Sequence, residues 1–151
     1  MLEFCTLGTG GTLPIPERAL SSLYIRVNGR GLIIDCGEGT QVQLRRSSLP
    51  FDRIGHIFIS HIHGDHCFGL IGMISTFGMR GRTAPLHVYA PAALEPMLKA
   101  QMDMFCNGLE YEGVFHAVET TLLQVIYEDK SVTVGTIPLE HRVPCCGYLF
   151  R

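Results

Sequence analysis

The clearest candidate for chemistry is the segment 60–66, whose sequence S-H-I-H-G-D-H holds four potential metal ligands. It directly follows the apolar run 57–59, which predicts the end of a buried strand. Because side chains alternate along a strand, the first two histidines should lie on one side, and the glycine then lets the backbone turn sharply. The aspartate and the last histidine would follow at the entrance of a helix. One metal ion cannot conveniently take all four ligands, so the spacing predicts two adjacent metal ions.

The types of these ligands indicate a catalytic site. Imidazole and carboxylate groups without a thiolate suit zinc, and also manganese or iron, in a site that keeps an open position. Two metal ions about 3.5–4 Å apart suit in-line displacement at phosphorus. The competing interpretation is a polar loop whose histidines cap a helix or face water, and H-x-H-x-D-H directly after a buried strand argues against it.

Two residues elsewhere are further candidates, and their spacing leaves two interpretations open for each. His141 lies at a strand-to-loop junction, so it is either another ligand or an ordinary loop histidine. Asp35 ends a predicted strand, so it either orients a ligand histidine through a hydrogen bond or is an acidic residue at a helix start. His56, His87 and His116 belong to apolar strands and are expected to be structural or surface residues.

The elements that would position these residues mix strands with helices. Helices are predicted over 39–46, after residue 64, and over 91–105, where Pro91 suits a first turn. The middle helix should bury Leu70, Met73, Ile74 and Phe77, which recur at helical spacing. We therefore expect a mixed α/β fold with a substantial antiparallel part, in which two helices cover one face of a sheet. The predicted strands are 2–7, 23–27, 32–34, 54–59, 86–89, 115–118, 122–127, 132–137 and 147–150.

Length and composition limit the possible classes of protein. The chain has 151 residues, of which 46% are hydrophobic and 17% are charged, so we expect a single globular domain over 1–151. No apolar run reaches the ~18 residues that span a membrane, and the amino terminus lacks a basic secretory start. Six irregularly spaced cysteines predict reduced thiols and a cytoplasmic protein. The net charge of −2 argues mildly against a nucleic-acid partner.

The motif at 61–66 resembles the H-x-H-x-D-H motif of the metallo-β-lactamase superfamily, and further segments look like the ribonuclease Z family in particular. The resemblance covers the whole chain but only about the first half of a typical member. It implies a truncated metallo-β-lactamase-like domain, the N-terminal half of an αββα sandwich. The matching segments are F-C-T-L-G-T-G-G-T-L-P at 4–14, D-C-G-E-G-T-Q at 35–41, S-H-I-H-G-D-H-C-F-G-L at 60–70, V-Y-A-P at 88–91, and His141 with the later G-Y at 147–148.

The resemblance also implies a role for each matching polar residue at the metal site. Asp65 would accept the proton of the attacking water, and Asp35 would orient the ligands without binding metal. The implied ligands are His61, His63 and His141 for a first zinc ion, and Asp65 and His66 for a second.

A loop after the first strand is implied to read the 3′ end of the substrate. Its matching residues are Arg18, Ser21 and Ser22. Two positions of this loop depart from the family, because Pro16 stands where a lysine is usual and Ala19 where an asparagine is usual. These two departures put in question how this loop distinguishes one substrate from another.

The implied activity is that of a zinc-dependent endoribonuclease acting on precursor tRNA, which leaves a 3′-hydroxyl on the tRNA and a 5′-phosphate on the trailer. The family's bridging aspartate, its last zinc-binding histidine, a late histidine motif and a basic arm lie beyond the equivalent of Arg151. We therefore expect an incomplete second zinc site and little activity from this chain alone. An uncovered apolar sheet face would also favour self-association as a homodimer.

Two other functions stay open at this point. The first is another phosphodiesterase of the same superfamily, which would cleave a chromogenic phosphodiester but not precursor tRNA. The second is a non-catalytic half-domain or interaction module whose metal residues are vestigial, which would fail to bind zinc.

Overall fold

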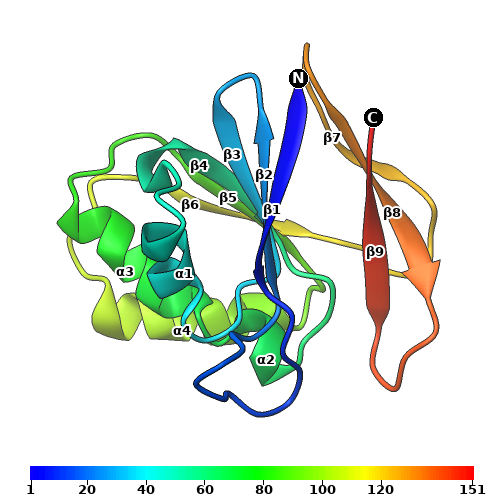
Figure 1. Cartoon of the computed structure of the whole chain (residues 1–151), viewed down its shortest axis with the longest axis horizontal. Helices are drawn as coiled ribbons and strands as arrows, with labels where there is room; N and C mark the ends of the chain where they lie inside the picture. Colours follow the sequence, from blue (N-terminus) through cyan, green and yellow to red (C-terminus); the bar gives the residue numbers. More distant parts are fainter.

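The computed structural model describes residues 1–151 as three layers, in which helices cover one face of a large sheet and a small sheet covers the other (Figure 1). The helices are α1 Thr40–Arg46, α2 Gly64–Cys67, α3 Leu70–Met79 and α4 Leu94–Phe105, with a short 3-10 turn, η1, at Phe51–Arg53. The strands are β1 Leu2–Gly8, β2 Ser22–Val27, β3 Arg30–Ile34, β4 Ile54–Phe58, β5 Leu86–Ala90, β6 Gly113–Ala117, β7 Val125–Glu128, β8 Thr133–Leu139 and β9 Cys145–Phe150.

The large sheet has the strand order β1-β2-β3-β4-β5-β6. Its first three strands are antiparallel, and β2 and β3 form the predicted hairpin across Asn28 and Gly29, which both have positive φ as a tight two-residue turn requires. From β3 to β6 the strands are parallel, so their carboxyl ends meet at one edge. Loops at such an edge are the usual place for a site in an α/β fold, and segment 60–66 leaves β4 there.

Two apolar cores hold the three layers together. The larger one, 21 residues, lies between the large sheet and the helices, and it contains Leu70, Met73, Ile74 and Phe77 as their helical spacing predicts. The smaller core, nine residues including Phe58, lies between the large sheet and the antiparallel sheet β7-β8-β9. The predicted mixed α/β fold is therefore confirmed, with α3 and α4 on the same face of the large sheet (Figure 1).

The helix expected after the metal motif is divided into α2 and α3 at Phe68 and Gly69. The cause is a close approach of two backbones, because the Gly69 N–H donates to the Cys36 carbonyl at 2.9 Å. A Cβ on Gly69 would lie 2.2 Å from the carbonyl oxygen of Gly37, so no other residue fits without displacement. This contact joins the metal motif to the loop that follows β3.

Two predicted boundaries were wrong by three residues. The last long helix begins at Leu94 rather than Pro91, because the first residues form tight turns in which Leu94 N–H donates to the Pro91 carbonyl at 3.0 Å. The strand expected from residue 122 begins at Val125, because Thr136 of β8 bonds the preceding segment through its hydroxyl and N–H groups instead of a regular ladder. Neither difference changes the layers.

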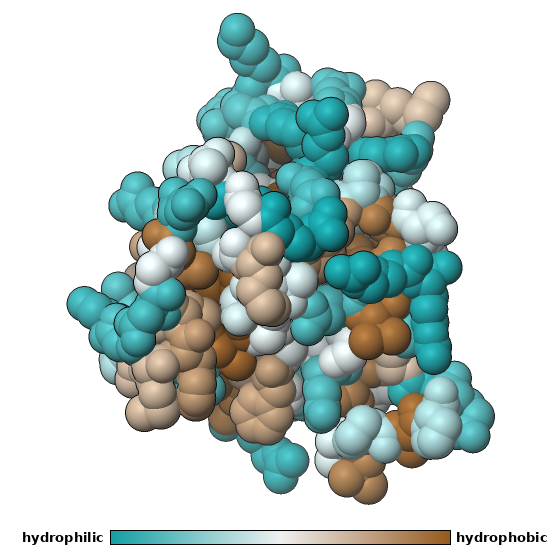
Figure 2. Space-filling view, turned by 90° about the vertical axis from the view of Figure 1, so that its left-hand side faces the viewer, coloured by the Kyte–Doolittle hydropathy of each residue, from teal (hydrophilic) through white to brown (hydrophobic).

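The small sheet and the segment just before β7 carry exposed apolar side chains. Leu123 is 73% exposed, and Leu122, Val125, Ile137 and Leu139 are exposed as well. The opposite side of the molecule, over the helices, is shown in Figure 2, where hydrophilic and apolar side chains are interspersed. No helix is long and apolar enough to cross a membrane, and all six cysteines are free thiols.

Candidate metal centre

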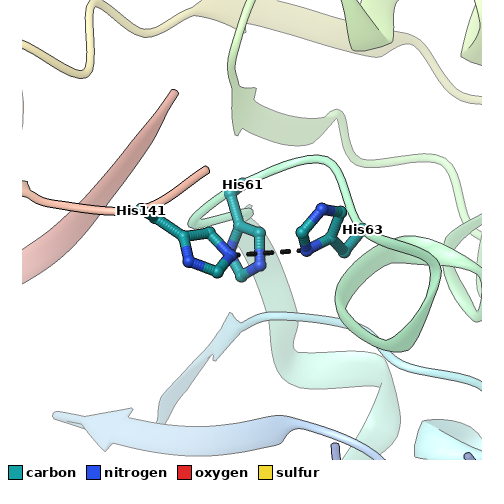
Figure 3. Close-up of side chains that lie close together, drawn as sticks. All are labelled: His61, His63 and His141. Atoms are coloured by element: carbon teal, nitrogen blue, oxygen red, sulfur yellow. Dashed lines mark hydrogen bonds between the residues drawn. The ribbon is translucent and has the colours of Figure 1, made fainter. Parts of the chain in front are cut away.

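Three histidines converge from two distant parts of the chain (Figure 3). His61 and His63 lie in the turn between β4 and α2, and His141 lies in the loop between β8 and β9. One ring nitrogen of each lies within 4.8 Å of the other two, and His141 Nε2 is 3.4 Å from His63 Nδ1. The sequence left the role of His141 open, and the fold brings it to the motif.

The spacing of these nitrogens fits a zinc ion. A tetrahedral zinc ion with Zn–N bonds of about 2.0–2.1 Å separates its ligand nitrogens by roughly 3.3 Å, close to the separation between His63 and His141. Neutral imidazoles with free lone pairs are the required donors. The three histidines can therefore hold one metal ion and leave a fourth position open.

Asp35 organises the other side of the motif from an unusual backbone position. Its φ of 57° lies in the left-handed region, which aspartate tolerates better than most residues, and its N–H donates to the Phe58 carbonyl at 2.8 Å. Its carboxylate accepts three hydrogen bonds, from the Ser60 N–H at 2.8 Å, the Ser60 hydroxyl at 3.0 Å and His66 Nδ1 at 2.7 Å. Asp35 therefore orients His66, a histidine of the motif, through a hydrogen bond, and its role beside a metal stays a prediction.

These contacts assign the tautomers of two histidines. A carboxylate only accepts, so His66 carries its proton on Nδ1 and presents the Nε2 lone pair. The single proton of the Ser60 hydroxyl goes to Asp35, so His61, 2.9 Å away, donates from Nδ1 and also presents Nε2. One buried carboxylate thus fixes the tautomers of both imidazoles, directly for His66 and through Ser60 for His61, and leaves their Nε2 lone pairs free to bind a metal.

Asp65 lies at the start of α2, where its Oδ2 accepts the Thr12 N–H at 2.8 Å and lies 3.6 Å from His66 Nε2. Burial raises the pKa of this carboxyl, but the hydrogen bonds from the Thr12 and Asp65 backbone, together with His66 and His61, outweigh burial, and the net pKa is lowered. Asp65 is therefore ionised at neutral pH and can bind a cation or accept a proton. Asp65 and His66 form a second pair of donors beside the three histidines.

The environment also sets the protonation of the histidines. Burial, together with the nearby His66, lowers the pKa of His61 to about 4. Burial lowers the pKa of His66, but its hydrogen bond to Asp35 and the negative charges of Asp35 and Asp65 together outweigh burial, so the net pKa is raised. His61 is neutral at physiological pH, as a metal ligand must be.

A cavity of about 610 Å³ opens onto these ligands. Thr12, Glu38, Phe68 and Arg142 line it although none of them was predicted as a site residue. The first three lie inside the segments 4–14, 35–41 and 60–70 that carry the family resemblance, and Arg142 follows His141. The residues that line it are Thr12, Pro14, Leu20, Glu38, His61, His63, Gly64, Asp65, His66, Phe68, His141 and Arg142.

The three residues expected to read the substrate do not line this cavity. Arg18 is exposed in the loop before β2, and Ser21 is half-buried, with its carbonyl accepting the Gly37 N–H at 3.1 Å. Ser22 is 3% exposed, and its hydroxyl has no hydrogen-bond partner. Their role in substrate binding stays a prediction.

Replacing Asp35 with asparagine is expected to weaken zinc binding by about 10- to 100-fold, the usual cost of losing a group that orients a ligand. Asparagine keeps the size of the side chain and its tolerance of positive φ, but it removes the charge and one acceptor from His66 and Ser60. Competition with a chromogenic chelator measures the affinity. Glu38→Gln is the matched control, because Glu38 lines the cavity but is exposed. Equal losses in both variants would contradict the prediction.

The remaining histidines form a separate row on β4, β5 and β6, on the face toward the small sheet. His56 stacks on His87 with ring centroids 4.9 Å apart, and His87 Nδ1 lies 3.0 Å from His116 Nε2. The Tyr127 ring covers His56 at 4.3 Å. Burial, followed by His87, Arg30 and His116, lowers the pKa of His56 to about 4, although Asp129 raises it. These histidines are structural, as their sequence context predicts.

We expect acid to destabilise the fold through His56. Its pKa is about 4 in the folded chain and about 6.5 when unfolded, so the unfolded chain binds more protons between these values and stability falls as pH drops from 6.5 to 4. The loss attributable to this residue is roughly 2 to 3 kcal/mol. Urea unfolding of the wild type and of His56→Gln at several pH values between 4 and 6.5 gives the free energy of unfolding as a function of pH. That free energy should fall more steeply toward low pH in the wild type than in His56→Gln, and equal slopes would refute the prediction.

Comparison with known proteins gives one family and several relatives. A family model described as Anti-Pycsar protein Apyc1 matches residues 2–141. A Ribonuclease Z from Bacteroides fragilis is 52% identical over 148 residues, which cover 98% of this chain and 49% of that protein. The chain spans about half the length of the curated relatives it matches.

Solved structures agree with the observed layers. Human tRNase Z, short form, superimposes on 100% of this chain and 65% of its own chain with a TM-score of 0.89 at 31% identity. The metallo-beta-lactamase fold protein YhfI from Bacillus subtilis is 20% identical, with a TM-score of 0.74 over 99% of this chain and 58% of its own, so that likeness concerns the fold alone. The predicted metallo-β-lactamase-like fold is confirmed.

Proposed function

Because this chain belongs to the family described as Anti-Pycsar protein Apyc1, is homologous to bacterial ribonuclease Z and has a metallo-β-lactamase-like fold, we propose that it carries the metal-binding half of a zinc-dependent endoribonuclease. The proposed substrate is precursor tRNA. Hydrolysis of one phosphodiester would leave a 3′-hydroxyl on the tRNA and a 5′-phosphate on the trailer. The free thiols support a cytoplasmic location for this reaction.

The observation that carries this proposal is the convergence of His61, His63 and His141 within 4.8 Å, beside Asp65 and His66. Three imidazoles suit one zinc ion, and a carboxylate with an imidazole suits a neighbouring one. Manganese or iron would be accepted by the same donors. A pair of metals next to an open cavity is the arrangement that phosphodiester hydrolysis uses.

Each residue then has a distinct task. Bound zinc would supply Lewis acidity that acidifies water and offsets charge on the phosphate. Asp65 is ionised at neutral pH and would accept the proton of the attacking water. Asp35 would hold His61 and His66 in the tautomers that present Nε2. Arg142, which lines the cavity beside His141, would place a positive charge near the phosphate.

We assign Asp65 and His66, which lie 3.6 Å apart, to the second metal position, and the curated relatives are about twice as long as this chain. We infer that the three-histidine position binds zinc tightly and the second position weakly. Hydrolysis would therefore be slow in this chain alone. Completion of the second position would need donors from additional chain or from another copy.

Self-association through the outer face of the small sheet is part of this proposal, as a homodimer in solution. Leu123, 73% exposed, and its apolar neighbours form the contact surface. Leu123→Lys is expected to weaken association at least ~10-fold, because two-fold symmetry would bring the new charges together. Light scattering over a concentration series measures this. Met79→Lys is the control, being 78% exposed at the end of α3, and a wild type that stays monomeric would disprove the dimer.

The test of the function has two steps. Elemental analysis of protein purified without chelator gives the zinc per chain, and incubation with precursor tRNA followed by end analysis gives the reaction. One zinc with slow cleavage to a 3′-hydroxyl tRNA would agree with the proposal, and Asp65→Asn should lower that rate by about 10²- to 10⁴-fold. A chain without zinc would indicate a non-catalytic module instead.

The family match favours a second candidate, because the model that matches residues 2–141 is not named after ribonuclease Z. This candidate is another phosphodiesterase of the same fold, with the same metal residues and a smaller substrate. Cleavage of bis(p-nitrophenyl) phosphate without cleavage of precursor tRNA would select it.

A further inference from the structure

Phe68 is an exposed aromatic residue at the mouth of the metal cavity. It directly follows α2, and 67% of it is exposed to solvent. It lines the same cavity as His63, Asp65 and Arg142. Apart from the histidines, it is the one aromatic residue among those lining this cavity. A large apolar ring left open to water beside a set of polar ligands indicates that something packs on it during function.

One side of the Phe68 ring packs on the backbone at the start of α2. An added Cβ on Gly64 would meet the Cε2, Cζ and Cδ2 atoms of Phe68 at 2.3, 2.6 and 2.7 Å, so the ring lies against the bare backbone of Gly64. The Phe68 N–H also donates to the Gly64 carbonyl at 2.9 Å, and the next residue, Gly69, is bonded to Cys36. A ring positioned in advance binds a partner at a smaller cost in entropy than a mobile one.

The cavity offers more room than a phosphate group needs. Its volume of about 610 Å³ lies in the range of sites for small organic ligands, roughly 300–1,000 Å³. Arg142 and the metal ligands would attract the phosphate, and Phe68 would supply a flat apolar surface next to it. Unpaired nucleobases stack on such surfaces whatever their sequence, because every base has a π face.

We propose that Phe68 stacks on an unpaired nucleobase adjacent to the scissile phosphate, so that the site selects nucleotidyl phosphodiesters with a single-stranded end over small phosphodiesters without a base. The inference rests on the proposed function and adds a specificity-determining residue to it.

The test measures binding rather than cleavage. A dinucleoside monophosphate of RNA that carries 2-aminopurine is titrated with the zinc-loaded 151-residue chain, and stacking is followed as quenching of the 2-aminopurine fluorescence. An abasic version of the same dinucleotide competes for the site in a parallel titration. The variants are Phe68→Ala and Phe68→Leu, of which the second keeps apolar bulk without a π face. Phe105→Ala is the matched control, because Phe105 is 66% exposed at the end of α4 and does not line the cavity.

The wild type and Phe105→Ala should quench the 2-aminopurine fluorescence. Both should also bind the 2-aminopurine dinucleotide more tightly than the abasic dinucleotide. Phe68→Ala should lose the quenching and bind about 5- to 100-fold more weakly, with Phe68→Leu close to it. Absence of quenching in the wild type, or equal binding by Phe68→Ala, would overturn the inference. Quenching that depends on Phe68 in a chain that does not cleave precursor tRNA would sink the proposed function and keep the stacking role. Cleavage of precursor tRNA at the same rate by the wild type and Phe68→Ala would keep the proposed function and overturn the stacking role.

Discussion

Replacing His63 with alanine is expected to weaken zinc binding by this chain by more than ~100-fold. Loss of a residue that merely orients a ligand costs about 10- to 100-fold, and loss of one of three direct donors costs more. His63 is the partner that lies 3.4 Å from His141, so its removal leaves His61 and His141 as the remaining imidazoles of that position. Titration with zinc against a chromogenic chelator at neutral pH measures the change.

The matched control for this experiment is His116→Ala. His116 is also partly buried and also lies beside another histidine, at 3.0 Å from His87, but it belongs to the row outside the cavity. Its removal should leave zinc affinity within about two-fold of the wild type, because no metal donor is lost. If His63→Ala and His116→Ala lose zinc affinity equally, the loss is not specific to the proposed ligands, and the assigned metal centre is refuted.

Replacing Phe58 with alanine is expected to lower the free energy of unfolding by about 3 to 5 kcal/mol. Phe58 is fully buried between the two sheets, and its ring lies 4.7 Å from Tyr89, 5.3 Å from Tyr148 and 5.9 Å from Phe150. The cavity left by alanine removes packing from both sheets at once, and aromatic pairs contribute beyond their buried area. A domain with a total stability of about 5–15 kcal/mol would lose much of it.

Urea unfolding followed by circular dichroism measures this loss. Phe4→Ala is the control, because the same side chain is removed from β1 at a position 75% exposed, where a change within about 0.5 kcal/mol is expected. Similar midpoints for Phe58→Ala and the wild type would mean that the small sheet does not pack on Phe58 in solution. The same result would remove the basis for placing His141 next to the motif.

Local pattern in the sequence was enough to predict much of the fold. The helical spacing of Leu70, Met73, Ile74 and Phe77 identified a buried helix face, because a 3.6-residue repeat places those side chains on one side. The Asn28-Gly29 dipeptide identified a hairpin, because both residues accept the positive φ of a tight turn. These features depend on neighbours in the chain, so a single sequence contains them.

Boundaries that depend on distant contacts could not be predicted in this way. The division between α2 and α3 arises because Gly69 approaches Cys36 and Gly37, more than thirty residues earlier. The row of His56, His87 and His116 likewise exists only because three parallel strands stand side by side. Nothing in the spacing of these residues along the chain specifies those contacts.

The sequence by itself determined that four candidate metal donors lie close together, because six consecutive residues after a strand cannot lie far apart. These candidates are His61, His63, Asp65 and His66. Tertiary structure decided the rest of the site. The loop between β8 and β9 brings His141 next to His63, which is 78 residues earlier in the sequence. The end of β3 places Asp35 within hydrogen-bond distance of His66. The physical reason is that the sheets, packed on their two cores, place these loops at one edge, and sequence separation carries no information about that packing.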